Sequence, residues 1–459
     1  MKWEMMEDGW VMPVKSWCEN CEDGAVKQAA NLARHPALFH HVALMPDAHQ
    51  GYGMPIGGVV AADNAVIPAA VGVDIGCGMI ATETDIPAER FADMSFRRAF
   101  QERLKERIPV GEGVSHKTTQ NWEGFEEYTA NNGMRSNLWP SKLDRMNLGT
   151  LGGGNHFIEL QKSVPMTGRA NTPGSPDCGA LISPERSEHC EAMSLEVCDR
   201  ALPAMVGTDH WAARIDECAD GESRVWLMIH SGSRNLGKRI EEHYHRIANR
   251  LCTRFHVPLA DPDLAFLPIA EKDGHDYFTD MLFALRYAKE NRRRMMEAMK
   301  ETVAEFVPEA NFLRTIDIHH NYATCEEHFG KKVFVHRKGA TSAKLDEIGV
   351  IPGSMGTASY IVRGLGNPDS FMSCSHGAGR RMSRVAASTT LTVEECDKAM
   401  EGIVCERWQK YTGFSKKAKG KFDLSEAPQA YKDIEDVIAS ERDLVEPLVR
   451  LVPLASLKG

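Results

Sequence analysis

Hydrophobic residues recur at intervals of three and four positions along several long segments, and this periodicity predicts amphipathic helices. The segments are Pro87–Ile108, Met281–Val307, Thr392–Trp408 and Pro428–Val452. Shorter apolar runs that end in polar or glycine-rich turns predict strands instead. These runs are Val42–Met45, Arg224–Ile229 and Lys332–Val335. Helices and strands follow one another without a regular strand–helix–strand alternation, so the pattern predicts an α+β fold rather than a doubly wound sheet.

One stretch, Gln161–Asp220, is punctuated by proline and glycine rather than by apolar periodicity. Examples are Pro165, Gly168 and the run Pro173-Gly174-Ser175-Pro176. Loops of this length are uncommon inside compact domains, and they usually lie on the surface. We therefore expect this stretch to be a surface linker or insertion.

The composition is that of an ordinary globular protein with a sizeable core: 459 residues, 42% hydrophobic and 26% charged. No run of about 18 apolar residues occurs, so we expect no transmembrane span. The first residues lack the basic and apolar regions of a signal peptide. We therefore expect a cytoplasmic protein whose twelve cysteines are free thiols or metal ligands. The net charge of −10 argues against coating nucleic acid through global charge, but it leaves a locally basic active site open.

Glycine is concentrated beside residues that could bind ligands. The clusters are Gly51–Gly58, Gly72–Gly78, Leu151–His156, His230–Arg234, Pro352–Gly356 and His376–Arg380. Glycine allows main-chain N–H groups to approach an anion closely. One glycine-rich turn is usually only a turn, but repeated clusters that carry His, Asp, Cys, Ser or Arg indicate a binding site.

Several of these clusters hold side chains that ligate metals. Asp74 and Cys77 lie three positions apart in one glycine-rich loop, and Asp47 and His49 precede them. Further candidates next to Gly, Ser or Asn are His156, His230, His319 and His320. Thiolate, carboxylate and imidazole together suit Zn²⁺ or Mn²⁺. For any one histidine alone, an ordinary core or loop role is the favoured alternative, and the spacing matches no zinc finger.

Other cysteines suggest chemistry without defining it. The pair Cys18-x-x-Cys21 is typical of metal or redox sites, but no second pair follows at zinc-ribbon spacing, so a purely structural role competes. The stretch described above also holds Cys178, His189, Cys190, Cys198 and Cys218. Their irregular spacing disfavours an accessory zinc site.

His376 lies between Ser373-Cys374-Ser375 and Gly377-Ala378-Gly379-Arg380-Arg381. An imidazole flanked by small residues and followed by arginines could attack phosphorus and hold the resulting anion, although a helix-capping turn is the alternative. His336–Thr341 is a second basic turn, with a solvated charge pair as its alternative. Arg292–Arg294 and Lys416–Lys421 fit solvated faces or contacts with an RNA backbone.

Taken in order, these segments closely resemble the RtcB family of GTP- and Mn²⁺-dependent RNA ligases. The matching blocks are Asp47–Gly58, Val71–Gly78, Leu148–Glu159, Leu227–Gly237, His319–Tyr322, His336–Ala343, Ile351–Tyr360, Cys374–Ala386 and Leu457–Gly459. The resemblance implies one large α+β domain over residues 1–459, with mixed sheets and surrounding helices. It also implies a surface insertion at about residues 162–217, where the family has a shorter connection.

The resemblance further implies a site with two Mn²⁺ ions and GTP. One ion would be held by Asp74, Cys77 and His156, and the other by Cys77, His230 and His320. His320 is preferred to His319 because the family ligand directly precedes an asparagine, here Asn321. His376 would be the nucleophile that accepts GMP. The implied GMP contacts are Asn155, His156, Phe157, Ile158, Glu159, His320, Asn321, Pro352, Gly353, Ser354, Met355, Ser359, His376, Gly377, Ala378, Gly379 and Lys458.

The implied reaction joins an RNA 3′-phosphate or 2′,3′-cyclic phosphate to a 5′-hydroxyl, as in tRNA splicing or RNA repair. A 3′-phosphate is a poor electrophile until GMP is transferred to it, and a neutral histidine can carry that GMP. RNA is the expected partner, an activating protein is compatible with the sequence, and no membrane partner is expected. Two alternatives are a two-metal phosphoesterase or nuclease and a catalytically silent RNA-binding scaffold.

Overall fold

The computed structural model describes residues 1–132, 138–164, 223–406, 408–411, 413 and 415–459. Its first main sheet has six strands in the order β1-β2-β3-β4-β12-β11. Their bounds are β1 Trp3–Met5, β2 Val14–Ser16, β3 Leu38–His49, β4 Ile56–Ala62, β12 Lys331–Lys338 and β11 Asn321–His328. All neighbours in this sheet are antiparallel except β2 and β3.

The second main sheet has seven strands, and every neighbouring pair is antiparallel. In sheet order they are β10 Phe312–His319, β6 Gly78–Pro87, β8 Arg224–Ser231, β7 Phe157–Val164, β17 Val445–Lys458, β15 Ser359–Gly364 and β14 Ile348–Ile351. Two small two-stranded ribbons are also present among the described residues. They pair β13 Ala340–Ser342 with β16 Ser373–Ser375, and β5 Ala65–Val66 with β9 Leu267–Pro268.

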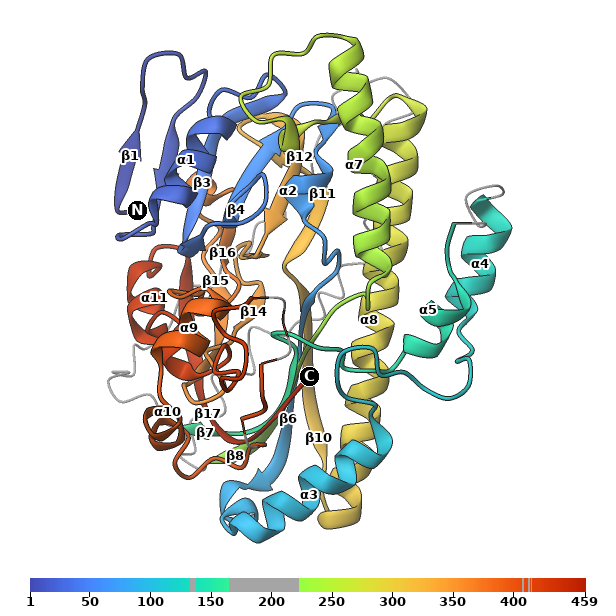
Figure 1. Ribbon diagram of the computed structural model, residues 1–459, viewed down its shortest axis with the longest axis vertical. Helices are drawn as coiled ribbons and strands as arrows, with labels where there is room; N and C mark the ends of the chain where they lie inside the picture. The colour runs from blue at the N-terminus through green and yellow to red at the C-terminus, as the bar shows by residue number, and fades with distance from the viewer. Residues whose placement is uncertain (133–137, 165–222, 407, 412, 414) are drawn as a thin grey trace, which may run out of the picture.

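Helices surround the sheets, and α7 and α8 run side by side along one flank of the molecule (Figure 1). The 35-residue helix α8 is about 50 Å long. The α-helices are α1 Asp23–Leu32, α2 Pro68–Val71, α3 Met94–Arg107, α4 Glu123–Asn132, α5 Lys142–Asn147, α7 Leu236–Arg254, α8 Lys272–Phe306, α9 Arg384–Thr390, α10 Val393–Ala399 and α11 Ile434–Ser440. Short 3₁₀ turns occupy Ala88–Phe91, Pro262–Leu264, Pro368–Ser370 and Pro428–Ala430.

The α+β prediction is confirmed, and the predicted strands lie within β3, β8 and β12. The long helix predicted from Met281 is α8, which begins earlier, and the segment Pro87–Ile108 forms a 3₁₀ turn followed by α3. The Thr392–Trp408 prediction was too long. There α10 begins at a capping box of Thr392 and Glu395, and Gly402, with φ +82°, follows its end.

The helix predicted over Pro428–Val452 was wrong in its second half. The 3₁₀ turn Pro428–Ala430 and α11 are the helical parts of this segment, and the chain from Val445 onward is strand β17 between β7 and β15. The apolar residues are spaced as in an amphipathic helix, but Pro447 and Pro453 disfavour helical structure. The strands on either side, β7 and β15, supply backbone hydrogen-bond partners that stabilise a strand instead. The insertion predicted from residue 162 begins inside β7, which runs to Val164; residues 165–222 lie outside the described part of the chain.

The fully buried side chain of Arg292 links helix α8 to the second sheet by hydrogen bonds. Its guanidinium donates to Asp317 Oδ1 at 2.6 and 2.9 Å and to the carbonyls of Gly76 and Ser231 at 2.9 and 3.1 Å. Arg292 is therefore not part of the solvated face suggested by the run of three arginines. It joins the helix to three separate segments around the strand ends.

Replacing Arg292 with Leu should lower the free energy of unfolding by about 3–5 kcal/mol, because Asp317, whose side chain is only 13% exposed, loses its partner, and the backbone carbonyls bound by the guanidinium lose theirs. Urea denaturation measures this loss. Arg293→Leu is the matched control: that side chain is 55% exposed and pairs with Glu290 on its own helix, so the change should stay within about 0.5 kcal/mol. Equal losses in the two variants would contradict the role given to Arg292.

Candidate active site

Four of the expected metal ligands lie at one edge of the seven-stranded sheet. Cys77 and His156 directly precede β6 and β7, His230 is the second-last residue of β8, and His320 directly follows β10. The antiparallel register pairs Met79 with His230, Phe157 with His230, and Gly78 with His319. Strand starts and strand ends therefore meet at the same edge, and the four side chains are brought together.

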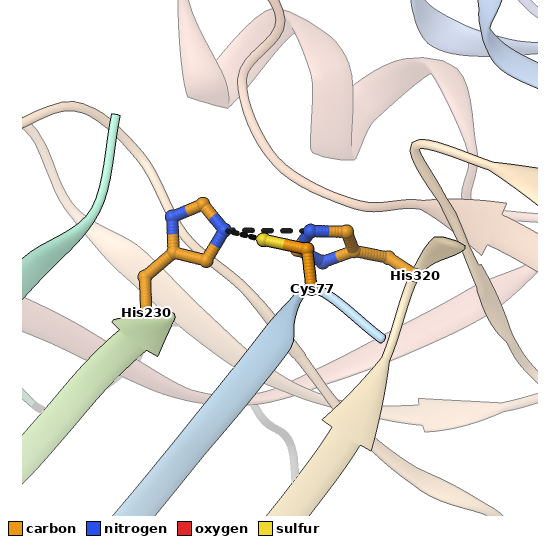
Figure 2. A group of neighbouring side chains, drawn as sticks. All are labelled: Cys77, His230 and His320. Atoms are coloured by element: carbon orange, nitrogen blue, oxygen red, sulfur yellow. Dashed lines mark hydrogen bonds between the residues drawn. The ribbon is translucent and has the colours of Figure 1, made fainter. Parts of the chain in front are cut away.

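The ligand atoms converge closely. Cys77 Sγ is 3.2 Å from His230 Nε2 and 3.5 Å from His156 Nε2, and His230 Nε2 is 3.3 Å from His320 Nε2. Figure 2 shows Cys77, His230 and His320 directed toward one another from separate segments. Two groups result, Cys77–His230–His320 and Asp74–Cys77–His156, in each of which the ligand atoms lie within 4.8 Å of one another.

Asp74 enters from the loop between α2 and β6. Its Oδ2 lies 3.2 Å from His156 Nε2, and its carbonyl accepts hydrogen bonds from the Cys77 amide and the Asn321 side chain at 3.0 and 3.1 Å. Gly232 is required opposite it, because a Cβ there would stand 2.5 Å from Asp74 Oδ1. The loop conformation and a close backbone approach together fix the carboxylate.

The outer nitrogens of two imidazoles are held by backbone carbonyls. His156 Nδ1 donates to Leu151 O at 3.0 Å, and His230 Nδ1 donates to Asn155 O at 3.2 Å, which leaves the Nε2 lone pairs facing the cluster. Burial lowers the pKa of His230 well below its ordinary value, so this ring is neutral at neutral pH. His320 Nδ1 is buried without a hydrogen-bond partner among the described residues.

These features fit a metal centre. Buried neutral imidazoles, a thiol and a carboxylate are unfavourable neighbours unless a cation joins them. A soft thiolate with nitrogen and oxygen ligands suits Mn²⁺ or Zn²⁺, and Cys77 belongs to both groups, so its sulfur could bridge two ions.

His376, which follows β16, is positioned by Asp47 near the end of β3. Asp47 Oδ2 accepts hydrogen bonds from His376 Nδ1 at 2.6 Å and from its backbone amide at 3.1 Å. Because a carboxylate accepts the Nδ1 proton, Nε2 carries the lone pair. The rings of His376 and His320 are 5.0 Å apart. Gly379 permits this arrangement, since it has φ +71° and a Cβ there would be 2.3 Å from Asp47 O.

A cavity of about 390 Å³ joins His376 to the ligand cluster. Among the expected GMP contacts, those that line it are Asn155, Phe157, His320, Asn321, Pro352, Gly353, Ser354, Met355, His376, Gly377, Ala378, Gly379 and Lys458. A larger cavity of about 1110 Å³ adjoins it and shares Val73, Asp74, Asn155, Met355, Arg384 and Lys458. His156 lines only this larger cavity.

Three expected contacts do not line either cavity. Ile158 faces the opposite side of β7 from Phe157 and packs in a hydrophobic cluster, as strand alternation requires. Glu159 and Ser359 are both buried and both accept a hydrogen bond from Gln161 Nε2, at 2.7 and 3.1 Å. Burial raises the pKa of Glu159 to about 7.

Other sequence candidates have different surroundings. The Nδ1 atom of His319 lies 3.1 Å from Gly76 O, and His319 is in neither ligand group. Arg337, expected in a phosphate-binding turn or a solvated pair, is instead fully buried and paired with Glu326 at 2.8 Å. Its neighbour Lys338 does line the smaller cavity, and burial lowers its pKa to about 8. Arg380 is bound by Glu426, Tyr431 and Ser425.

Sequence reasoning identified Asp47 only as a metal-ligand candidate and missed its pairing with His376, 329 positions away. Its place in a glycine-rich block was the available signal. His49 also lines the smaller cavity, but neither residue belongs to the ligand groups. The cysteines and histidine of the expected insertion lie outside the described residues. No helix in the described part of the chain is long and apolar enough to cross a membrane.

The fold and site together define an α+β protein with a metal-ligand cluster beside a histidine–aspartate pair. A family model described as tRNA-splicing ligase RtcB matches residues 28–175 and 195–459. The chain therefore belongs to the RtcB family.

The chain is also similar to individual RtcB proteins over nearly its whole length. RNA-splicing ligase RtcB of Escherichia coli is 34% identical, with 97% of each chain covered. RNA-splicing ligase RtcB of Mycobacterium tuberculosis is 31% identical, covering 94% of this chain and 100% of the relative. The tRNA-splicing ligase RtcB of Thermococcus kodakarensis is 28% identical, covering 95% of this chain and 92% of the relative.

Removing the shared ligand should weaken metal binding at both groups. Cys77→Ala is expected to lower the affinity for Mn²⁺ at least about 100-fold, more than the loss of an outer partner of a ligand costs. Titration calorimetry and the electron paramagnetic resonance of free Mn²⁺ measure this. Cys252→Ala, at a buried cysteine on α7 outside both groups, should bind as the wild type does. Unchanged Mn²⁺ binding by Cys77→Ala would show that the cluster is not a metal centre.

Proposed function

We propose that this protein is an RNA ligase that joins 3′-phosphate or 2′,3′-cyclic phosphate ends to 5′-hydroxyl ends through GMP bound covalently to His376. The observation that carries the proposal is that His376, hydrogen-bonded to the buried Asp47, lines the same cavity as Cys77, His230 and His320. A nucleotidyl-transfer reaction needs a nucleophile and a metal centre within one site. Membership of the RtcB family supports the same conclusion.

His376 is suited to attack the α-phosphorus of GTP. Asp47 holds the Nδ1 proton, so Nε2 is the free nucleophile, and Asp47 stabilises the ring as positive charge develops on it. The N–P bond forms as the bond from the α-phosphorus to the pyrophosphate oxygen breaks. A 2′,3′-cyclic phosphate is first hydrolysed by water, which breaks the bond from phosphorus to the 2′-oxygen and leaves a 3′-phosphate. The RNA 3′-phosphate then takes GMP from the histidine, and the 5′-hydroxyl attacks the RNA phosphorus and displaces GMP.

Asp74, Cys77 and His156 would hold one Mn²⁺, and Cys77, His230 and His320 the other. When bound, such ions neutralise phosphate charge and align attacking and leaving oxygens. The protein contributes fixed geometry: backbone carbonyls orient His156 and His230, and Asn321 fixes the Asp74 loop.

The two adjoining cavities suit two substrates. We assign GMP to the smaller cavity, where Phe157, Asn321 and the Pro352–Met355 turn would surround it. The RNA ends would approach through the larger cavity, whose lining includes Arg234, Lys238 and Arg384. These cations would hold RNA phosphates by position and charge rather than by covalent chemistry.

His376→Ala should abolish formation of a GMP adduct because the nucleophile is gone, while Mn²⁺ binding persists because the metal ligands remain. Incubation with α-labelled GTP and Mn²⁺, followed by peptide mass spectrometry, measures the adduct. His275→Ala, at a half-exposed histidine on α8, is the control and should label normally.

Sealing of RNA supplied with a pre-guanylylated 3′ end should survive in His376→Ala, since that step needs no histidine carrier. Label uptake by His376→Ala would place the nucleophile elsewhere. Hydrolysis of RNA by the wild type without any adduct would favour a two-metal nuclease instead.

Asp47→Asn should slow adduct formation by about 10²–10⁴-fold, the range for removing an acid–base or orienting partner of a catalytic histidine. The amide has no charge to stabilise the ring, and it can favour the other tautomer. Single-turnover labelling gives the rate. Asp63→Asn, at a surface aspartate paired with Lys331, should leave the rate unchanged. A wild-type rate in Asp47→Asn would refute the assigned positioning role.

A further inference from the structure

The Cys18-x-x-Cys21 pair lies in the connection between β2 and α1, before the region matched by the family model. Cys18 is 1% exposed, and Cys21 is half-buried. A turn at Glu19 and Asn20 separates them, and the side chain of Cys21 lowers the pKa of the Cys18 thiol. A turn of this kind brings its end residues within about 7 Å, which is compatible with the span of a disulfide.

Cys18 has a lysine beside its sulfur. Lys432 Nζ donates to Cys18 Sγ at 3.4 Å. The hydrogen bond from Cys21 and the charge of Lys432 outweigh burial and lower the pKa of Cys18 to about 7. Two acidic groups have the opposite effect: the charge of Asp47 raises the pKa of Cys18, and the charge of Glu22 raises the pKa of Cys21. The pair therefore holds a thiolate near neutral pH, the form that reacts with disulfides.

Lys432 also forms hydrogen bonds with the segment that contains Asp47. Its Nζ also donates to the carbonyls of Pro46 and Ala48, at 3.1 and 2.8 Å, on either side of Asp47. Its backbone amide donates to Gly379 O at 2.9 Å. Lys432 thus connects the cysteine pair to both sides of the Asp47–His376 contact.

A metal site is not supported here, because within the described residues no third ligating side chain joins the pair. We propose that Cys18 and Cys21 are a redox-active dithiol that forms a reversible disulfide, and that its formation withdraws the sulfur contact from Lys432. The consequence for His376 rests on the proposed function, whereas the disulfide itself does not.

The step balances with a small-molecule disulfide as oxidant. Cys21, the more accessible thiol, passes its proton to the adjacent Cys18 thiolate and attacks oxidised glutathione as the thiolate; one glutathione leaves as thiolate and takes that proton from Cys18. The Cys18 thiolate then attacks the Cys21 sulfur, the mixed disulfide breaks, and the second glutathione leaves as thiolate. Two cysteine sulfurs are oxidised, and one glutathione disulfide is reduced to two thiols.

The test equilibrates the full chain in buffers of varied reduced and oxidised glutathione, traps free thiols with an alkylating agent, and maps the peptides. We expect a Cys18–Cys21 peptide two hydrogens lighter than its reduced form, and none in Cys21→Ser. Lys432→Met should form it about fivefold to tenfold more slowly at pH 7, because the thiolate fraction falls, while Lys432→Arg keeps the charge and should react faster than Lys432→Met. No disulfide at any glutathione ratio, or equal rates in the wild type and Lys432→Met, overturns the assignment.

A second arm measures the GMP adduct before and after oxidation. The oxidised wild type should form the adduct severalfold more slowly, and Cys21→Ser should not respond to the same buffer. Equal rates in the two redox states would overturn the link to Lys432. A disulfide that forms in a protein making no adduct in either state would instead refute only the proposed function.

Discussion

The antiparallel register of four strands is the constraint on which the candidate site depends. A ligand-bearing residue sits at the start or end of β6, β7, β8 and β10, and only the observed pairing puts all four at one edge. A slip of one residue would turn each side chain to the other face of the sheet. The buried guanidinium of Arg292 contacts Gly76, Ser231 and Asp317, one segment beside each of three ligands, and so opposes such a slip.

The nucleophile and the ligand cluster come from different parts of the fold. Asp47 belongs to the six-stranded sheet, whereas Cys77 and His230 belong to the edge of the seven-stranded sheet. One hydrophobic cluster contains residues of both sheets, with Val59 and Val335 from one and Ile351 and Tyr360 from the other. Close packing of this core sets the distance between His376 and the cluster, because such interiors deform little.

Local chemistry made part of this structure predictable. The long helix α8 and the strands β3, β8 and β12 follow from their own apolar patterns, and motif resemblance predicted which Asp, Cys and His residues converge in the two groups. Properties that depend on distant partners were not predictable in the same way. The apolar residues of β17 are spaced as in a helix, and its strand conformation depends on backbone pairing with β7 and β15, which the local sequence does not reveal. The sequence around Arg337 suggests a solvated charge, because its partner Glu326 lies on the neighbouring strand and is not apparent from the local sequence.

The distribution of charge explains how a chain with net charge −10 can offer a basic site. Glu426 accepts Arg380 at 3.2 Å and Lys458 at 3.1 Å, and it lies 3.9 Å from Arg384. Burial alone would raise the pKa of Glu426, but Lys458 and Arg380 outweigh it and lower the pKa, so the carboxylate stays ionised. One carboxylate in the lining of the larger cavity therefore holds Lys458 and Arg384, which line both cavities. Arg384 is the most exposed of these cations and the most distant from Glu426. An incoming phosphate could therefore bind Arg384 in place of Glu426 with the smallest loss of ion-pair energy.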